Sequence, residues 1–106
     1  MNNWIEIGHI NEIPQLGSRV VKTNSGKIAI FRNSEDEVFA LGDRCPHKGG
    51  PLSEGMISGR TVTCPLHNWK LQLDTGMAIA PDDGCTNTYP IRIEEDIIYL
   101  QLAGDA

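Results

Sequence analysis

The fold of this chain is decided by two short stretches, Cys45-Pro-His47 and Cys64-Pro-Leu-His67, which are separated by sixteen residues. Each stretch offers one thiolate and one imidazole, and Pro and Gly residues lie around both. Such residues favour irregular backbone that approaches a buried group closely. A single Cys or His is more often a core or surface residue than a ligand. Four of them in two matching loops predict a metal centre instead.

The mixture of ligand types within each loop favours one kind of metal centre. A zinc finger usually takes Cys-x-x-Cys from one loop and paired histidines from a helix, so zinc matches this pattern poorly. In a mixed-ligand 2Fe-2S cluster, two cysteines bind one iron and two histidines bind the other. We therefore predict that Cys45, His47, Cys64 and His67 bind one 2Fe-2S cluster. A zinc-stabilised β module used only for binding is the alternative.

This ligand set has a consequence for electron transfer. Two ferric ions, two sulfides and two thiolates cancel in charge, whereas four thiolates would leave the oxidised cluster as a dianion. A neutral centre accepts an electron at a lower electrostatic cost, so its reduction potential should exceed that of all-cysteine ferredoxins. The residues therefore predict one-electron transfer, and we expect no catalytic residue in this chain.

The rest of the sequence has the pattern of short β-strands joined by tight turns. Runs rich in β-branched or aromatic residues occupy 28–31, 38–41, 60–64, 71–73, 91–93 and 97–102. The polar segments 23–27, 33–37 and 94–96 lie between them and are predicted to form hairpin turns. No segment keeps a helical apolar repeat over three turns, and we expect only short helical turns, within 10–16 and after His47. The predicted fold class is all-β.

The residue types that shape loops are concentrated in 42–86. This segment holds all three cysteines, four of the six prolines and seven of the eleven glycines. A length of 106 residues suits one hydrophobic core region rather than two independent domains. We therefore expect 1–106 to form a single domain, with 42–86 as a loop-rich cluster-binding subdomain inserted into the β scaffold.

Composition limits the partners and the compartment. Nine Lys and Arg against fourteen Asp and Glu give a net charge of −5, which disfavours nucleic acid and anionic membrane surfaces as partners. The N-terminus lacks the basic start and apolar stretch of a signal peptide, and no run is long enough to span a bilayer. Three cysteines argue against a disulfide framework. We expect a cytoplasmic protein.

The two motifs resemble those of the Rieske family, which are Cys-x-His and Cys-x-x-His separated by about sixteen or seventeen residues. The resemblance implies an antiparallel β-sandwich or barrel with an inserted cluster-binding subdomain. Respiratory Rieske proteins have a further cysteine at the positions of Gly50 and Leu66, where the two form a disulfide, and a serine at the position of Trp69 that donates to the cluster. Their absence implies a ferredoxin-like protein with a lower reduction potential.

Longer strings resemble the small subunit of NAD(P)H-dependent nitrite reductase. They are Cys45-Pro-His-Lys-Gly-Gly-Pro-Leu-Ser-Glu-Gly55, Cys64-Pro-Leu-His-Asn-Trp-Lys70, Pro81-Asp-Asp-Gly-Cys85 and Thr88-Tyr-Pro90. This resemblance implies a large-subunit partner that carries FAD and siroheme and reduces nitrite to ammonium in nitrate assimilation. The ligand motif alone allows an alternative, a free-standing Rieske ferredoxin that works with a ferredoxin reductase and an aromatic-ring oxygenase. Cys85, in the segment that resembles the third loop of Rieske domains, is expected to be a small buried residue.

Overall fold

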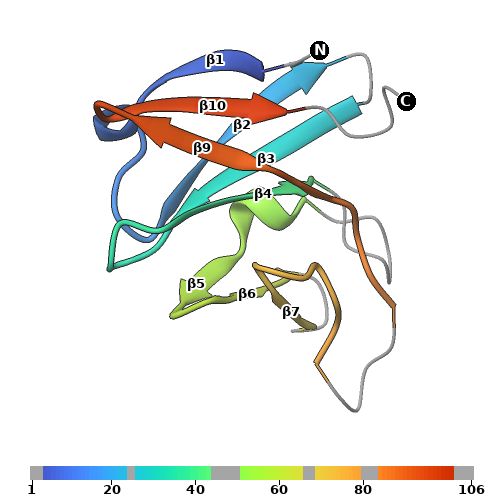
Figure 1. The fold of residues 1–106 in the computed structure, drawn as a ribbon. Helices are drawn as coiled ribbons and strands as arrows, with labels where there is room; N and C mark the ends of the chain where they lie inside the picture. Colours follow the sequence, from blue (N-terminus) through green and yellow to red (C-terminus); the bar gives the residue numbers. More distant parts are fainter. Residues whose placement is uncertain (1–3, 24–25, 44–50, 66–68, 80–83, 102–106) are drawn as a thin grey trace.

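The computed structural model describes residues 4–23, 26–43, 51–65, 69–79 and 84–101, which form three antiparallel sheets (Figure 1). The first sheet has the order β1 (Trp4–His9), β10 (Ile97–Gln101), β9 (Ile91–Glu94). The second has the order β2 (Gly17–Thr23), β3 (Gly26–Arg32), β4 (Val38–Gly42), β8 (Thr88–Tyr89). The third has the order β5 (Met56–Ser58), β6 (Thr61–Thr63), β7 (Lys70–Gln72). The described residues contain no α-helix, so the all-β prediction is confirmed.

Strand β3 lies at the centre of the molecule and is covered on both faces. Residues 28–31 are all fully buried. Because side chains alternate along a strand, Ala29 and Phe31 pack into one core with the third sheet, while Ile28 and Ile30 pack into another core with the first sheet. Figure 1 shows this layering, with β5–β7 below β4 and with β1, β9 and β10 above. A continuous apolar run is what a strand buried on both faces requires.

The predicted turns join the strands as expected. Residues 33–37 connect β3 to β4, and the side chain of Asn33 accepts hydrogen bonds from the backbone N of Glu35 at 3.0 Å and of Glu37 at 2.9 Å. Glu95 and Asp96 connect β9 to β10 with positive φ values of 51° and 66°. Such dihedrals match the twist of a two-residue hairpin. In the turn between β2 and β3, residues 24–25 lie outside the described residues.

Four strands were not predicted from the sequence: β1, β2, β5 and β8. Strand β1 is interrupted by a register shift between Glu6 and Gly8, which breaks the alternation of its side chains. Strand β2 lies at a sheet edge, and its exposed Arg19 and Lys22 make its sequence look like a loop. Strands β5 and β8 have three and two residues, which is too short for a period to be recognised.

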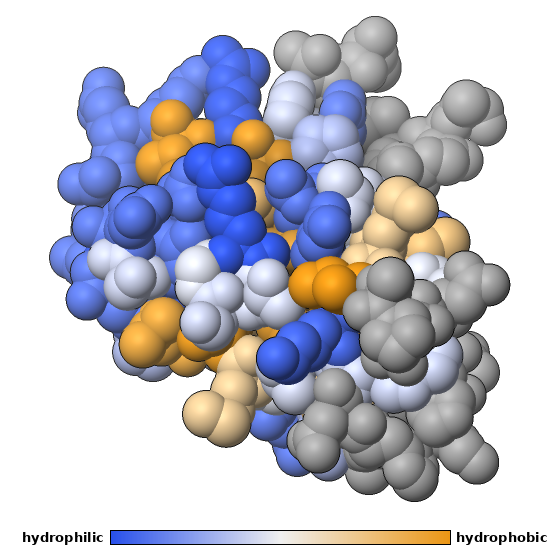
Figure 2. All heavy atoms as spheres, turned by 90° about the horizontal axis from the view of Figure 1, so that it is seen from below, coloured by the Kyte–Doolittle hydropathy of each residue, from blue (hydrophilic) through white to orange (hydrophobic). Residues whose placement is uncertain are grey.

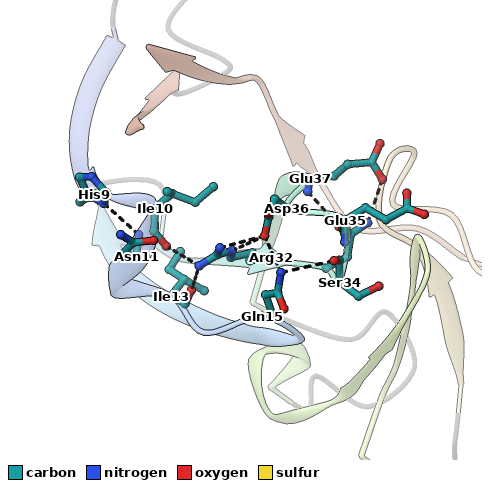
Figure 3. Close-up of polar contacts among 11 residues, drawn as sticks. His9, Ile10, Asn11, Ile13, Gln15, Arg32, Ser34, Glu35, Asp36 and Glu37 are labelled. Carbon is teal, nitrogen blue, oxygen red and sulfur yellow. Dashed lines mark hydrogen bonds and ion pairs between the residues drawn. The ribbon is translucent and has the colours of Figure 1, made fainter. Parts of the chain in front are cut away.

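Arg32 fixes the first helical turn against the second sheet (Figure 3). The turn η1 (Ile10–Glu12) begins after His9, whose Nδ1 accepts a hydrogen bond from Asn11 N at 3.1 Å. Arg32 Nη1 donates to Ile10 O at 3.1 Å and Ile13 O at 2.7 Å. Ile10 O also accepts from Ile13 N at 3.1 Å, so the two bonds from Arg32 add a side-chain attachment to both ends of the turn. The turn predicted within 10–16 is thus confirmed, and a second, η2 (Leu52–Glu54), follows His47 in sequence.

Large apolar side chains are exposed at several separate positions in the described part of the chain. Met56 and Met77 are the most exposed of the large apolar side chains among the described residues, at 78% and 56%. The face seen from below in Figure 2 carries apolar side chains in small separate groups among hydrophilic ones. No helix in the described ranges is long and apolar enough to cross a membrane.

Candidate metal centre

The second predicted ligand loop lies at the tip of the β6–β7 hairpin. Cys64 directly follows β6, and its backbone N donates a hydrogen bond of 2.6 Å to the carbonyl of Trp69, which directly precedes β7. This bond closes the six residues 64–69 into a loop. His67 belongs to that loop by sequence, although it lies outside the described residues.

Cys64 is fully buried at this tip. It belongs to the core between the second and third sheets, and Trp69 packs against the same core. The other buried members of this core are Ala29, Phe31, Leu41, Leu52, Ile57, Val62, Leu71 and Leu73. These surroundings shield the sulfur of Cys64 from water. Such shielding suits a cluster ligand, whereas reactive redox thiols are usually accessible to solvent.

The first predicted ligand loop is closed at its base by a carboxylate. Cys45 and His47 lie outside the described residues, but the chain on either side of them is described. Ser53 in η2 donates to Asp43 twice, from its backbone N to Oδ1 at 2.7 Å and from its hydroxyl to Oδ2 at 3.0 Å. The two ends of the segment that contains both ligands are therefore joined. Sequence reasoning missed Asp43 and Ser53, and the only available signal was the position of Asp43 two residues before Cys45.

The segment that resembles the third loop is closed in a similar way. Ala78 N donates to Gly84 O at 2.9 Å, and Met77 forms an isolated β-bridge with Cys85. Gly42 N donates to Asn87 O at 2.9 Å, so this segment also attaches to the end of β4. The described bases of all three loops are thus fixed by hydrogen bonds.

The expectation that Cys85 is buried is wrong, because its side chain is exposed. The reason is its position. Cys85 forms an isolated β-bridge with Met77, which is itself exposed, and among the described residues neither belongs to a buried core, whereas Cys64 does.

A protein-family model described as the Rieske [2Fe-2S] domain matches residues 3–90. The chain belongs to the Rieske [2Fe-2S] domain family. A Rieske domain holds a 2Fe-2S cluster, so this chain is a Rieske electron-transfer protein. The donor chemistry fits, since the one predicted ligand that the structure describes, Cys64, is a buried thiol at a hairpin tip. Cys45, His47 and His67 lie outside the described residues, so the full ligand set stays a prediction, as do the domain boundaries 1–106 and 42–86.

Relatives of this Rieske protein include small electron carriers of similar length. The ferredoxin component of the naphthalene 1,2-dioxygenase/salicylate 5-hydroxylase systems of a Ralstonia species is 33% identical over 101 residues, covering 94% of this chain and 96% of the relative.

Two solved structures show the same fold. The crystal structure of a protein described as an NADH-dependent nitrite reductase small subunit from Mycobacterium tuberculosis matches with a TM-score of 0.86 and 22% identity, covering 98% of each chain. The ferredoxin of carbazole 1,9a-dioxygenase from Nocardioides aromaticivorans IC177 matches with a TM-score of 0.83 and 17% identity, covering 92% of this chain and 96% of the other.

Proposed function

We propose that this Rieske protein is the electron-transfer small subunit of an NAD(P)H-dependent nitrite reductase. The observation that carries the proposal is the set of strings that resemble those of such subunits, including Pro81-Asp-Asp-Gly-Cys85 followed by Thr88-Tyr-Pro90. These strings extend beyond the four ligand positions, so they are more specific than the ligand motif. The described parts of this segment attach to the end of β4, where the first ligand loop begins, and to residues 76–78 after β7.

The chemistry of this chain assigns it a relay role. The cluster, when bound, accepts and donates one electron at a time. Nitrite reduction to ammonium takes six electrons, whereas a nicotinamide supplies two at once, so a one-electron carrier suits such an enzyme. The sequence has no Gly-x-Gly-x-x-Gly for a dinucleotide. FAD, siroheme and the nitrite site are therefore assigned to the large subunit.

A second candidate is a free-standing ferredoxin that serves an aromatic-ring oxygenase. It is favoured by the 33% identity to the Ralstonia ferredoxin component over nearly the whole length of both chains. The fold itself does not separate the two candidates, because nitrite reductase small subunits and oxygenase ferredoxins match it equally well.

Reconstitution with each class of partner distinguishes the candidates. The chain is purified, its mixed-ligand 2Fe-2S spectrum is recorded, and it is mixed either with the nitrite reductase large subunit of the same organism or with an oxygenase and its reductase. We expect stable co-purification with the large subunit and NAD(P)H-dependent loss of nitrite. Electron delivery to the oxygenase without association with the large subunit would instead establish the second candidate.

Two histidine variants test whether the cluster carries the electrons. His67→Ala should remove the spectrum and stop nitrite reduction by the complex. His9→Ala is the matched control, because His9 lies at the end of β1 and its described hydrogen bond is to Asn11 in η1. Full nitrite reduction by the His67→Ala complex would contradict an obligatory role of the cluster.

A further inference from the structure

The two ends of the segment that contains Cys45 and His47 are joined by one side chain, that of Asp43. Its carboxylate accepts two hydrogen bonds from Ser53, one from the backbone N at 2.7 Å and one from the hydroxyl at 3.0 Å. Both residues are partly buried. Hydrogen bonds to a carboxylate are stronger than those between neutral groups. We call this pair of bonds the Asp43–Ser53 clasp.

Both sides of the clasp are fixed to the β scaffold. On one side, Asp43 N donates to Lys27 O at 2.9 Å, which extends the pairing of β4 with β3. On the other side, the hydroxyl of Ser18 in β2 donates to Ser53 O at 2.7 Å. Through the clasp, both ends of the segment between Asp43 and Ser53 are therefore attached to strands of the central sheet.

The clasp also connects the two ligand loops. Leu52, next to Ser53 in η2, is fully buried in the same core as Cys64. Gly55, two residues after Ser53, approaches the backbone of Thr63, the residue before Cys64. A shift of Ser53 would consequently displace the first loop relative to Cys64.

We propose that Asp43 is a positioning residue for the cluster: through Ser53, it sets the separation of the two ends of the first ligand loop and so presents Cys45 and His47 to the metal in a fixed geometry. The proposal rests on the ligand assignment and not on the identity of the partner enzyme. Groups that orient metal ligands contribute to metal retention and to the electronic properties of the site.

Three variants separate hydrogen bonding from charge and from packing. Asp43→Ala removes both acceptors. Asp43→Asn removes the charge but keeps both contacts, because its Oδ1 accepts from Ser53 N and its Nδ2 donates to the Ser53 hydroxyl. Ser53→Ala removes only the hydroxyl bond and serves as the milder variant if Asp43→Ala fails to fold.

Glu37→Ala is the matched control. Glu37 is also a carboxylate that joins two loops, since it accepts from Arg60 and from Asn33. The turn that contains Arg60 is at the opposite end of β6 from Cys64, so this variant should lose stability without affecting the cluster.

The experiment measures the reduced-state electron paramagnetic resonance spectrum, the midpoint potential and the rate of bleaching by an iron chelator for each reconstituted variant. Removal of a ligand-orienting group typically costs 10–100-fold in metal affinity, so we expect Asp43→Ala to bleach roughly tenfold faster with a broadened spectrum. Ser53→Ala and Asp43→Asn should each show a smaller change in the same direction, because Ser53→Ala keeps one bond to the carboxylate and Asp43→Asn keeps two weaker, neutral bonds. Glu37→Ala should keep the wild-type spectrum and bleaching rate.

Two results would overturn the proposal while leaving the cluster assignment intact. One is a wild-type spectrum and bleaching rate in Asp43→Ala and Ser53→Ala. The other is an Asp43→Asn variant that loses the cluster as fast as Asp43→Ala, since charge and not hydrogen bonding would then be the cause. A wild-type chain that forms no mixed-ligand 2Fe-2S cluster would overturn the ligand assignment and this inference together, and association with the large subunit would still test the proposed function separately.

Discussion

Gly55 is a residue at which packing, and not backbone conformation, demands glycine. Its φ of −80° and ψ of 172° are accessible to any amino acid. A Cβ at this position, however, would lie 2.2 Å from the carbonyl oxygen of Thr63. Because that oxygen belongs to the backbone just before Cys64, it cannot move aside as a flexible side chain would. The approach of η2 to β6, and hence of one ligand loop to the other, depends on the missing side chain.

Overpacking of a tight core typically costs about 1–3 kcal/mol and occasionally more, and because the clash is with backbone we expect Gly55→Ala to destabilise the protein by at least the upper part of that range. Gly59→Ala on the neighbouring hairpin is the control. Nothing lies within 4 Å of its added Cβ, so only its φ of 59° is penalised, at about 1–2 kcal/mol. Chemical denaturation of both variants measures the difference, and a milder effect for Gly55→Ala than for Gly59→Ala would contradict the steric account.

At the scale of elements, the third sheet is held at both ends of β6. At the end of β6 that precedes Cys64, the close approach of Gly55 to Thr63 joins the third sheet to η2, and buried Cys64 joins it to the core. At the other end, the β5–β6 turn is joined to the β3–β4 turn by Arg60, which donates to Glu37 at 3.0 Å and 2.5 Å, and by Asn33, which donates to Gly59 O at 3.1 Å. The ligand hairpin is therefore attached to the central sheet independently of any bound metal.

The Glu37 attachment should make stability depend on pH. The hydrogen bond from Arg60, and then that from Asn33, lower the pKa of Glu37 from its ordinary value of 4.5 to about 2. A carboxyl with a lowered pKa in the folded state stabilises the protein above its unfolded-state pKa, and this contribution disappears as the pH falls from about 4.5 to about 2. In Glu37→Gln the contribution is absent at every pH.

Thermal unfolding midpoints of wild type and Glu37→Gln should therefore differ most near neutral pH and converge between pH 4.5 and 2. Glu6→Gln, which changes an exposed carboxylate on β1, is the control for a general effect of charge. A gap between wild type and Glu37→Gln that is constant across this pH range would show that Glu37 acts through packing and not through its ionised form.

At the scale of the whole molecule, the central sheet separates two cores with different neighbours. One lies between the second and third sheets and contains Cys64, and the other lies between the second and first sheets. Leu41 belongs to the first of these and Leu100 to the second, and both are fully buried. Removal of a buried leucine side chain leaves a cavity wherever it occurs, but only one of these cavities would adjoin the ligand loops.

Leu41→Ala and Leu100→Ala should each cost about 2–5 kcal/mol of stability, as is usual for a buried leucine. Only Leu41→Ala should also accelerate the loss of the cluster, because it loosens the core around Cys64 and Leu52. Denaturation curves and chelator bleaching of the two variants check this, and equal bleaching rates would contradict the separation of the molecule into two cores.

The sequence by itself determined the Rieske family and where most strands lie, and it predicts which side chains bind the cluster. The spacing of Cys45, His47, Cys64 and His67, the apolar run 28–31 and the turns at 33–37 and 94–96 depend on neighbouring residues, so they can be recognised locally. The family match confirms a Rieske domain, and the sheets confirm the apolar run and the turns, while the four-ligand set stays a prediction.

Only the tertiary structure decided which strands pair, that β3 is covered on both faces, that Cys85 is exposed, and that Asp43 joins the ends of a ligand loop. Each of these depends on groups distant in sequence. The partner of Asp43 is ten residues away, and β1 pairs with β10 from the opposite end of the chain. Local pattern cannot select such partners, because a hydroxyl or a short edge strand has many alternatives, and packing of the whole chain chooses among them.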